Sequence, residues 1–115
     1  MEYCISLGIS TSREPRDIVT ASRKGSKKHT FLGVSLQRAS MAFFVNNELL
    51  GEVVDTPDQA GQIVTFAYMP ARLEVKVGRL IFSVPCDTQL KDSHRYAAAV
   101  MDARHDLSPC WTIVA

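Results

Sequence analysis

The sequence predicts a single α+β domain over residues 1–115, built mainly from antiparallel β structure with one C-terminal amphipathic helix. Two observations predict the β part. Apolar residues alternate with polar ones along most of the chain, which is typical of half-buried strands. The candidate strands are separated by short turns, which favours antiparallel connections over parallel crossovers that need an intervening helix. We therefore expect six to eight short strands in a meander, barrel or sandwich.

The strands are expected where this alternation is clearest. The first runs from Tyr3 to Ile9, and its second face carries small residues, which suggests close packing there. The segment from Thr11 to Lys28 is polar, and only residues 17–21 of it favour a strand. Asn46 and Asn47 tolerate the positive φ of a two-residue hairpin turn. The other expected strands cover residues 32–36, 41–45, 48–54, 62–69, 72–77, 79–84 and 110–115.

The helix is expected from Asp92 to Leu107, because the apolar period there changes from two residues to a helical spacing. Asp92 or Ser93 is a suitable N-cap, the alanine run at 97–99 favours helix, and Ser108-Pro109 ends it. The apolar face of this helix would consist of Tyr96, Val100, Ala103 and Leu107.

Composition narrows the class of protein. With 115 residues and 46% hydrophobic content, the chain can bury a core and is not disordered. No apolar run is long enough to span a membrane, and the N-terminus lacks the pattern of a secretory signal. The three cysteines are widely spaced, which favours free thiols and a cytoplasmic location, with one Cys86–Cys110 disulfide as the alternative.

Charge is segregated along the chain, although the formal net charge is only +1. Residues 1–38 carry seven basic and three acidic side chains, whereas residues 39–71 carry four acidic and no basic ones. A flexible basic loop is the candidate for anion or nucleic-acid binding, through Arg23, Lys24, Lys27, Lys28 and His29. The candidate partner surface is acidic and consists of Glu48, Glu52, Asp55 and Asp58. Ordinary solvated turns are the alternative interpretation of both sets.

Motifs for catalysis and for cofactors are absent or weak. The glycine spacing excludes dinucleotide and P-loop fingerprints, and no zinc motif is present, so we expect no cofactor and no metal. Asp102, His105 and Asp106 could hold a hard metal ion or form a carboxylate–imidazole pair, unless His105 simply offsets the helix dipole. Cys86 precedes the expected helix and is the only cysteine placed for nucleophilic activation, against the default of a buried thiol.

Two short stretches resemble known families. Residues 84–91 resemble a strand end of the MazF-type toxins, which are small barrel ribonucleases, but the family's active threonine falls at Asp87 and its arginine motif has no counterpart here. Residues 29–52 are similar to the laminin-G or concanavalin-type sandwich repeat, in which a histidine precedes a strand and a hairpin follows. This second resemblance rests on His29 and on the hairpin Val45-Asn46-Asn47-Glu48-Leu49-Leu50-Gly51, and it implies antiparallel β structure and, as an alternative function, sugar binding.

Together these observations favour a small non-catalytic binding protein, such as an accessory or inhibitor protein, that presents a charged β-rich surface to a protein or a nucleic acid. The alternative from another class is a small-barrel nuclease-like enzyme acting on RNA or DNA, with His29 or His105 as the acid–base group. We also expect a homodimer, formed through an edge strand or through contact between the basic loop and the acidic hairpin.

Overall fold

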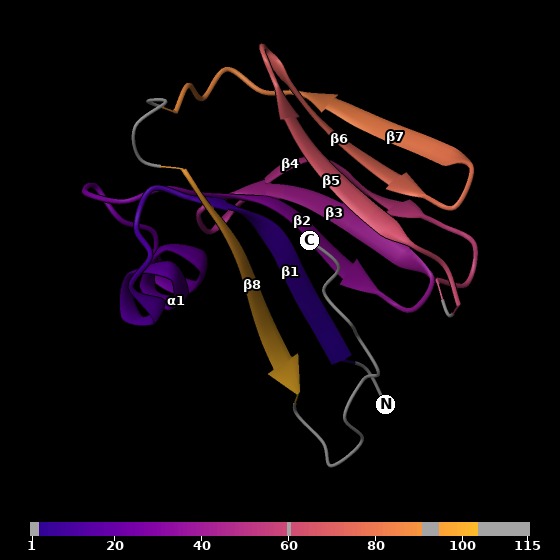
Figure 1. Cartoon of the computed structure of the whole chain (residues 1–115), viewed down its shortest axis with the longest axis horizontal. Helices are drawn as coiled ribbons and strands as arrows, with labels where there is room; N and C mark the ends of the chain where they lie inside the picture. Colours follow the sequence, from indigo (N-terminus) through magenta and orange to yellow (C-terminus); the bar gives the residue numbers. More distant parts are fainter. Residues whose placement is uncertain (1–2, 60, 91–94, 104–115) are drawn as a thin grey trace.

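The computed structural model describes residues 3–59, 61–90 and 95–103, and in that part of the chain it contains eight strands and one short helix (Figure 1). In chain order these are β1 (Tyr3–Ser10), α1 (Pro15–Lys24), β2 (Phe31–Gln37), β3 (Ser40–Val45), β4 (Glu48–Asp55), β5 (Val64–Met69), β6 (Arg72–Val77), β7 (Leu80–Pro85) and β8 (Tyr96–Ala103). The expectation of a mainly antiparallel β fold is confirmed, and the strands expected between residues 3 and 84 are present, apart from the short one allowed at residues 17–21, which lie in α1.

The strands form two antiparallel sheets. The first has five strands in the order β4-β3-β2-β1-β8, so that four consecutive strands form a meander and β8 returns to pair with β1. The second is the meander β5-β6-β7. In Figure 1 the two sheets lie as two layers.

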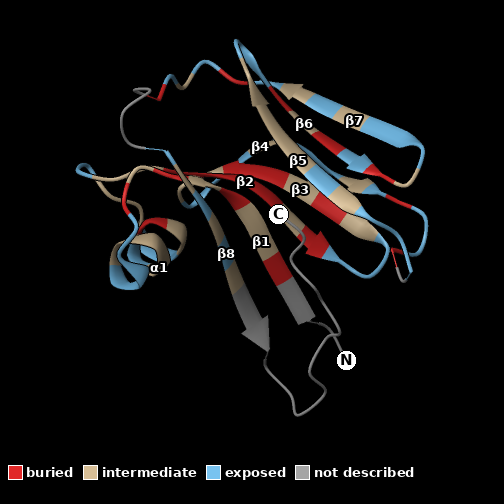
Figure 2. Cartoon of the chain, in the orientation of Figure 1, coloured by how far each residue is buried: buried red, intermediate tan, exposed pale blue. Residues whose placement is uncertain are grey.

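The hydrophobic core lies between the two sheets, because the apolar residues of each strand alternate toward the other layer. Leu73 and Val75 of β6 are fully buried against the five-stranded sheet, and Cys86 and Leu90 close one end. The five-stranded sheet contributes Ile5, Leu32, Val34, Leu36, Met41 and Phe43. Figure 2 shows these buried positions along the facing strands.

The hairpin turn expected at Asn46-Asn47 is confirmed. Val45 is paired with Glu48, which leaves two residues in the turn, and Asn46 has a φ of 55°. Asparagine adopts this left-handed conformation at low cost, which explains why the turn forms here. The hairpin that the laminin-G-type pattern implies is therefore present.

The prediction of a polar loop before β2 was wrong, because residues 15–24 form α1. The local signals for this helix are in the sequence. Pro15 occupies the first turn, Asp17 complements the positive end of the helix dipole, and Gly25 follows the last turn with a φ of 79°. The apolar face is narrow, and Ala21 is its one fully buried side chain, so the period was masked by the surrounding cations.

The predicted C-terminal helix over residues 92–107 was also wrong, because residues 96–103 form β8; the remainder of that range falls on residues outside the described part or, at Arg95, just before the strand. β8 pairs with β1 over its whole length, from Ser10 opposite Tyr96 to Tyr3 opposite Ala103. The alanine run has high helix propensity, but pairing with a strand that already belongs to the core overrides it. The Cys110–Ala115 strand lies outside the described residues.

The outer face of the five-stranded sheet carries small residues, as the first strand suggested. Gly8 and Gly33 lie directly opposite each other on β1 and β2, and a Cβ atom on either would overlap backbone of the other strand. At one end of this face, α1 packs on the sheet through Ala21 and Ile18, against the edge-to-face pair Phe31 and Phe44, whose ring centroids are 5.0 Å apart.

Candidate functional site

The most concentrated charge in the described part of the chain lies on α1 and on the loops at its two ends. All six basic side chains of this region are exposed, and we call them the basic surface: Arg13, Arg16, Arg23, Lys24, Lys27 and Lys28. The helix lies on the side of the five-stranded sheet that faces away from the β5-β6-β7 sheet (Figures 1 and 2). Neither sheet therefore covers the basic surface.

The helix orders part of this surface. Arg16, Thr20 and Arg23 follow one another at spacings of four and three residues, so they share one exposed stripe of α1. The two arginines are about 10 Å apart along the helix axis, at 1.5 Å per residue. Arg23 and Lys24 belong to the last helical turn, not to a flexible loop as expected, so only Lys27 and Lys28 lie in the connection to β2.

The cations of the basic surface have no acidic partner among the described residues. The ion pairs in that part of the chain are formed by His29, Arg38 and Arg72 instead. Arg23 and Lys24 also lie at the negative end of the helix dipole, which stabilises their positive charges. Helix stability is therefore one reason for basic residues at these two positions. The charge that remains is available to an external anion.

The connection between α1 and β2 has a defined backbone. The N–H of Gly25 donates to the Ala21 carbonyl at 3.1 Å, which closes the helix. The Oγ of Ser26 then accepts the N–H groups of Lys28 and His29 at 3.2 and 3.1 Å. These bonds form a compact turn that carries the Lys27 and Lys28 side chains on its exposed side.

Asn46 joins this connection to the β3–β4 hairpin. Its Oδ1 accepts the Phe31 N–H at 2.9 Å, and its Nδ2 donates to the Ser26 carbonyl at 3.4 Å. The backbone N–H of Asn46 donates to the Phe31 carbonyl at 2.7 Å. A Cβ atom on Gly25 would meet Oδ1 of Asn47 at 3.0 Å, so the helix end lies directly against the hairpin turn. The basic surface is thus held on a rigid sheet.

His29 lies inward of the lysines and is half-buried. Its Nε2 is 3.4 Å from Oδ2 of Asp17, in the first turn of α1, and Oγ of Ser12 donates to the same Oδ2 at 2.8 Å. Oγ of Ser12 also accepts the Glu14 N–H at 3.1 Å, just before the helix begins. His29 therefore ties the start of β2 to the start of α1 rather than extending the exposed cationic surface.

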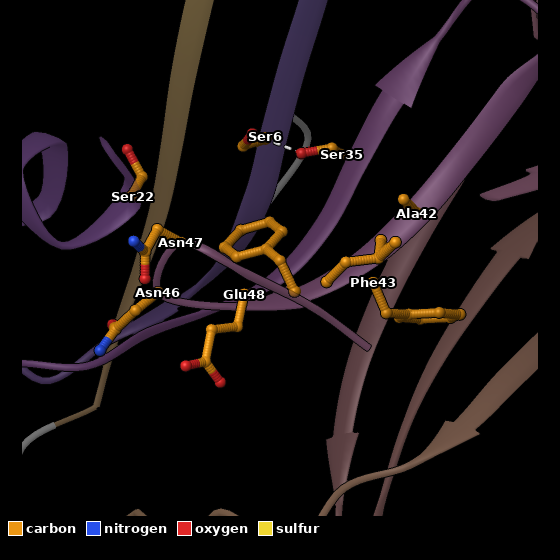
Figure 3. A pocket seen from close by; sticks show the side chains of 10 residues that line it. Ser6, Ser22, Ser35, Ala42, Phe43, Asn46, Asn47 and Glu48 are labelled. Carbon is orange, nitrogen blue, oxygen red and sulfur yellow. Dashed lines mark hydrogen bonds between the residues drawn. The ribbon is translucent and has the colours of Figure 1, made fainter. Parts of the chain in front are cut away.

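A shallow pocket adjoins the basic surface between α1 and the β3–β4 hairpin (Figure 3). Hydroxyl groups line it on the sheet side, where the Ser6 and Ser35 Oγ atoms are 2.9 Å apart. Ser22 of α1 and the two asparagines of the hairpin turn line the opposite side. In Figure 3 the Glu48 carboxylate points away from the paired serines, so the floor of the pocket is uncharged.

The predicted acidic residues follow the edge strand β4 and the loop after it. Glu48, Glu52 and Asp55 are exposed on β4. Asp58 is paired with Arg38, whose Nη2 lies 3.2 Å from its Oδ2. Glu48 adjoins the hairpin turn that contacts α1, so an acidic and a basic surface are neighbours on the same molecule.

The other predicted sites have less support or fall outside the described part of the chain. Cys86 has a free thiol and is 4% exposed within the core. This burial fits the default interpretation of Cys86 as a structural thiol. Within the described residues, no group of three histidine, cysteine or acidic side chains could hold a metal ion, and no helix could cross a membrane. His105, Asp106 and Trp111 lie outside the described residues, as does the side chain of Asp102.

Arg13 and Arg16 belong to the basic excess of residues 1–38 but were not included among the candidate site residues. For Arg16 the signal was its seven-residue spacing from Arg23, which has meaning only once the segment is assigned to a helix.

No protein-family model, no curated protein and no solved structure matches this chain.

Proposed function

We propose that this chain is a non-catalytic binding protein whose basic surface contacts the phosphates of a nucleic-acid duplex. The observation that carries the proposal is the gathering of six exposed cations, without acidic partners among the described residues, on one helix and its flanking loops. Such a surface binds by displacing the counterions that surround a nucleic acid, which needs no base recognition.

Rigidity supports this interpretation. The cations of the last helical turn and of the following loop are anchored to the sheet through Asn46 and through the His29–Asp17 pair. Long basic side chains on a rigid backbone lose less conformational freedom on binding than the same residues in a disordered loop, so each contact retains more of its free energy.

A duplex is favoured over a single strand by the absence of aromatic residues from the basic surface. Binding to single strands usually depends on bases that stack on exposed aromatic rings. The aromatic residues that form a buried cluster with Ala21 of α1 are Phe31 and Phe44. The contacts that this surface offers are therefore with the phosphate backbone, and we expect weak discrimination between sequences.

The test replaces Arg23, Lys24, Lys27 and Lys28 by serine and measures binding to a short DNA duplex by fluorescence anisotropy. Four phosphate contacts, each adding a salt slope of about 0.9, correspond at 0.15 M salt to about a thousandfold weaker binding. The matched control replaces Arg38, Arg72, Lys76 and Arg79, which lie away from α1, by serine and changes the net charge equally. We expect the control to bind within about tenfold of the parent, because screening limits the reach of distant charges.

Equal weakening of both variants would show that only net charge matters and would overturn the proposal. An absence of duplex binding by the parent would overturn it as well.

One observation favours the alternative of phosphodiester cleavage, namely the imidazole–carboxylate pair of His29 and Asp17 beside the basic surface. Such a pair can act as a general base. The nearby Ser12 hydroxyl, however, donates to Asp17 and not to the imidazole, so it is not arranged as an activated nucleophile. Gel analysis of the same duplex and of RNA after incubation distinguishes the two functions, because cleavage that disappears in His29→Ala would favour the enzyme.

A further inference from the structure

We propose that the outer edge of β7 pairs with β7 of a second copy of this chain, and that the three-stranded sheets of two molecules join into one. The proposal is independent of the basic surface. It rests on the backbone groups that β7 leaves open, on its uncharged composition, and on the contrast with the protected edge strands β4 and β5.

The phase of the hydrogen bonds identifies the open groups. The N–H of Cys86 donates to the Ala71 carbonyl at 3.0 Å, which continues the pairing of β7 with β6. Because successive residues of a strand point their backbone groups to opposite sides, Ile81 and Ser83 direct theirs away from β6. Within the described residues, β6 is the one strand that pairs with β7. Pro85, at the next outward position, has no N–H to leave unpaired.

The side chains of β7 also favour association. Leu80 is 47% exposed and Ile81 is 60% exposed, although both are large apolar residues. The strand sequence from Leu80 to Pro85 contains no charged residue. Exposed edge strands in proteins usually carry charges, bulges or covering segments that prevent association. In Figure 2, exposed residues alternate with half-buried ones along β7.

The edge strands β4 and β5 of the described sheets have such protection. β4 has a bulge at residues 51–53, because Val54 of β4 pairs with Met41 of β3 while Leu50 of β4 pairs with Phe43 of β3. β4 also carries Glu48, Glu52 and Asp55, which would repel the same residues of another copy. In the three-stranded sheet, the outer strand β5 lies close to β1 and β2. β8, the other edge of the five-stranded sheet, carries Asp102. β7 differs from β4 and β8 in having no charged residue, and its own protective feature is Pro85 at the end of the strand.

A second copy of the chain can pair with the open edge of β7, because the strand is self-complementary. In an antiparallel pair centred on Phe82, Ile81 of each copy would lie opposite Ser83 of the other, and their open N–H and C=O groups would bond reciprocally. Leu80 would lie opposite Val84, so no like charges meet, and the row of Leu80, Phe82 and Val84 stays apolar. The basic surface lies on the far sheet and would remain open in both copies (Figure 1).

The test measures the mass of the full chain by sedimentation equilibrium at micromolar concentrations, for the parent and for Ile81→Glu. This substitution places one negative charge on β7 of each copy, inside the proposed interface. The two charges should weaken the dimer and raise its dissociation constant about tenfold or more. The matched control is Thr65→Glu, since Thr65 lies in the same cross-strand row as Ile81, on the other side of Lys76, but on β5. The control should dimerise like the parent.

Ser83→Pro gives a second variant that does not depend on charge. It removes an N–H that the described fold does not use, and it should also produce monomers while circular dichroism and thermal unfolding remain close to the parent. High salt should leave the β7 dimer intact, whereas a dimer made by the basic and acidic surfaces would dissociate. A monomeric parent, a dimer that survives both variants, or a dimer that dissociates in salt would each overturn the proposal.

Discussion

Asn46 should contribute more to stability than an exposed hairpin turn normally does, and its separate roles can be measured. Replacing it by alanine leaves the Phe31 N–H without its acceptor, and Phe31 is fully buried. An unsatisfied buried donor costs about 1–3 kcal/mol. Alanine must also adopt the φ of 55° found at this position, which costs about 1 kcal/mol. The expected loss of unfolding free energy is therefore about 2–4 kcal/mol.

Two further variants separate these terms in urea denaturation followed by circular dichroism. Asn46→Asp keeps the acceptor oxygen and tolerates the left-handed φ, so it should lose less than about 1 kcal/mol, through the long bond to the Ser26 carbonyl. Asn46→Gly keeps the backbone conformation but not the acceptor, so it should lie between the other two. If the aspartate variant is as unstable as the alanine variant, the Phe31 bond is not what Asn46 contributes.

The remaining predictions concern single contacts in the fold. Gly33→Ala should destabilise the protein by more than about 3 kcal/mol or prevent folding, because its Cβ would overlap the Leu7 carbonyl. The control Gly61→Ala has open space around its Cβ and should cost only about 1 kcal/mol, for the positive φ at that position. Tyr68→Phe should cost about 1–3 kcal/mol and speed amide exchange at Leu90, because the Tyr68 hydroxyl accepts the Leu90 N–H and donates to the Thr88 carbonyl, both at 3.0 Å.

Most of the β structure could be predicted from the sequence, because its strands bury one face and therefore alternate. The segment from Arg72 to Val77 is the clearest example, and its alternating burial in β6 matches the alternation of its residues. Pairing partners and the division into two sheets could not be predicted, since they depend on contacts between distant segments. No local pattern indicates that Tyr96 would face Ser10.

The two errors have different physical origins. For α1, the local signals at Pro15 and Gly25 were sufficient, but the helix buries so little apolar surface that its period was weak. For β8, local propensity pointed to the wrong structure, because Ala97 to Ala99 favour a helix in isolation and a strand only beside β1. The second error needed tertiary information and the first did not.

The candidate site also combines features that local sequence predicts with features that depend on tertiary contacts. The exposed lysines and arginines could be identified from charge clustering alone. Their fixed arrangement could not, because it depends on Asn46 reaching back to Ser26 and on His29 reaching to Asp17. Those contacts join residues that lie 20 and 12 positions apart. They convert a run of basic residues into a surface of defined shape.

The most direct test of the proposed function is the dependence of duplex binding on salt concentration. For the parent and the variant with Arg23, Lys24, Lys27 and Lys28 replaced by serine, the logarithm of the association constant is plotted against the logarithm of the salt concentration. We predict that the parent slope is the steeper by about 3.6 units, at roughly 0.9 for each phosphate that the four cations neutralise. Equal slopes, or a parent whose binding does not depend on salt, would contradict the proposal that these side chains bind phosphates.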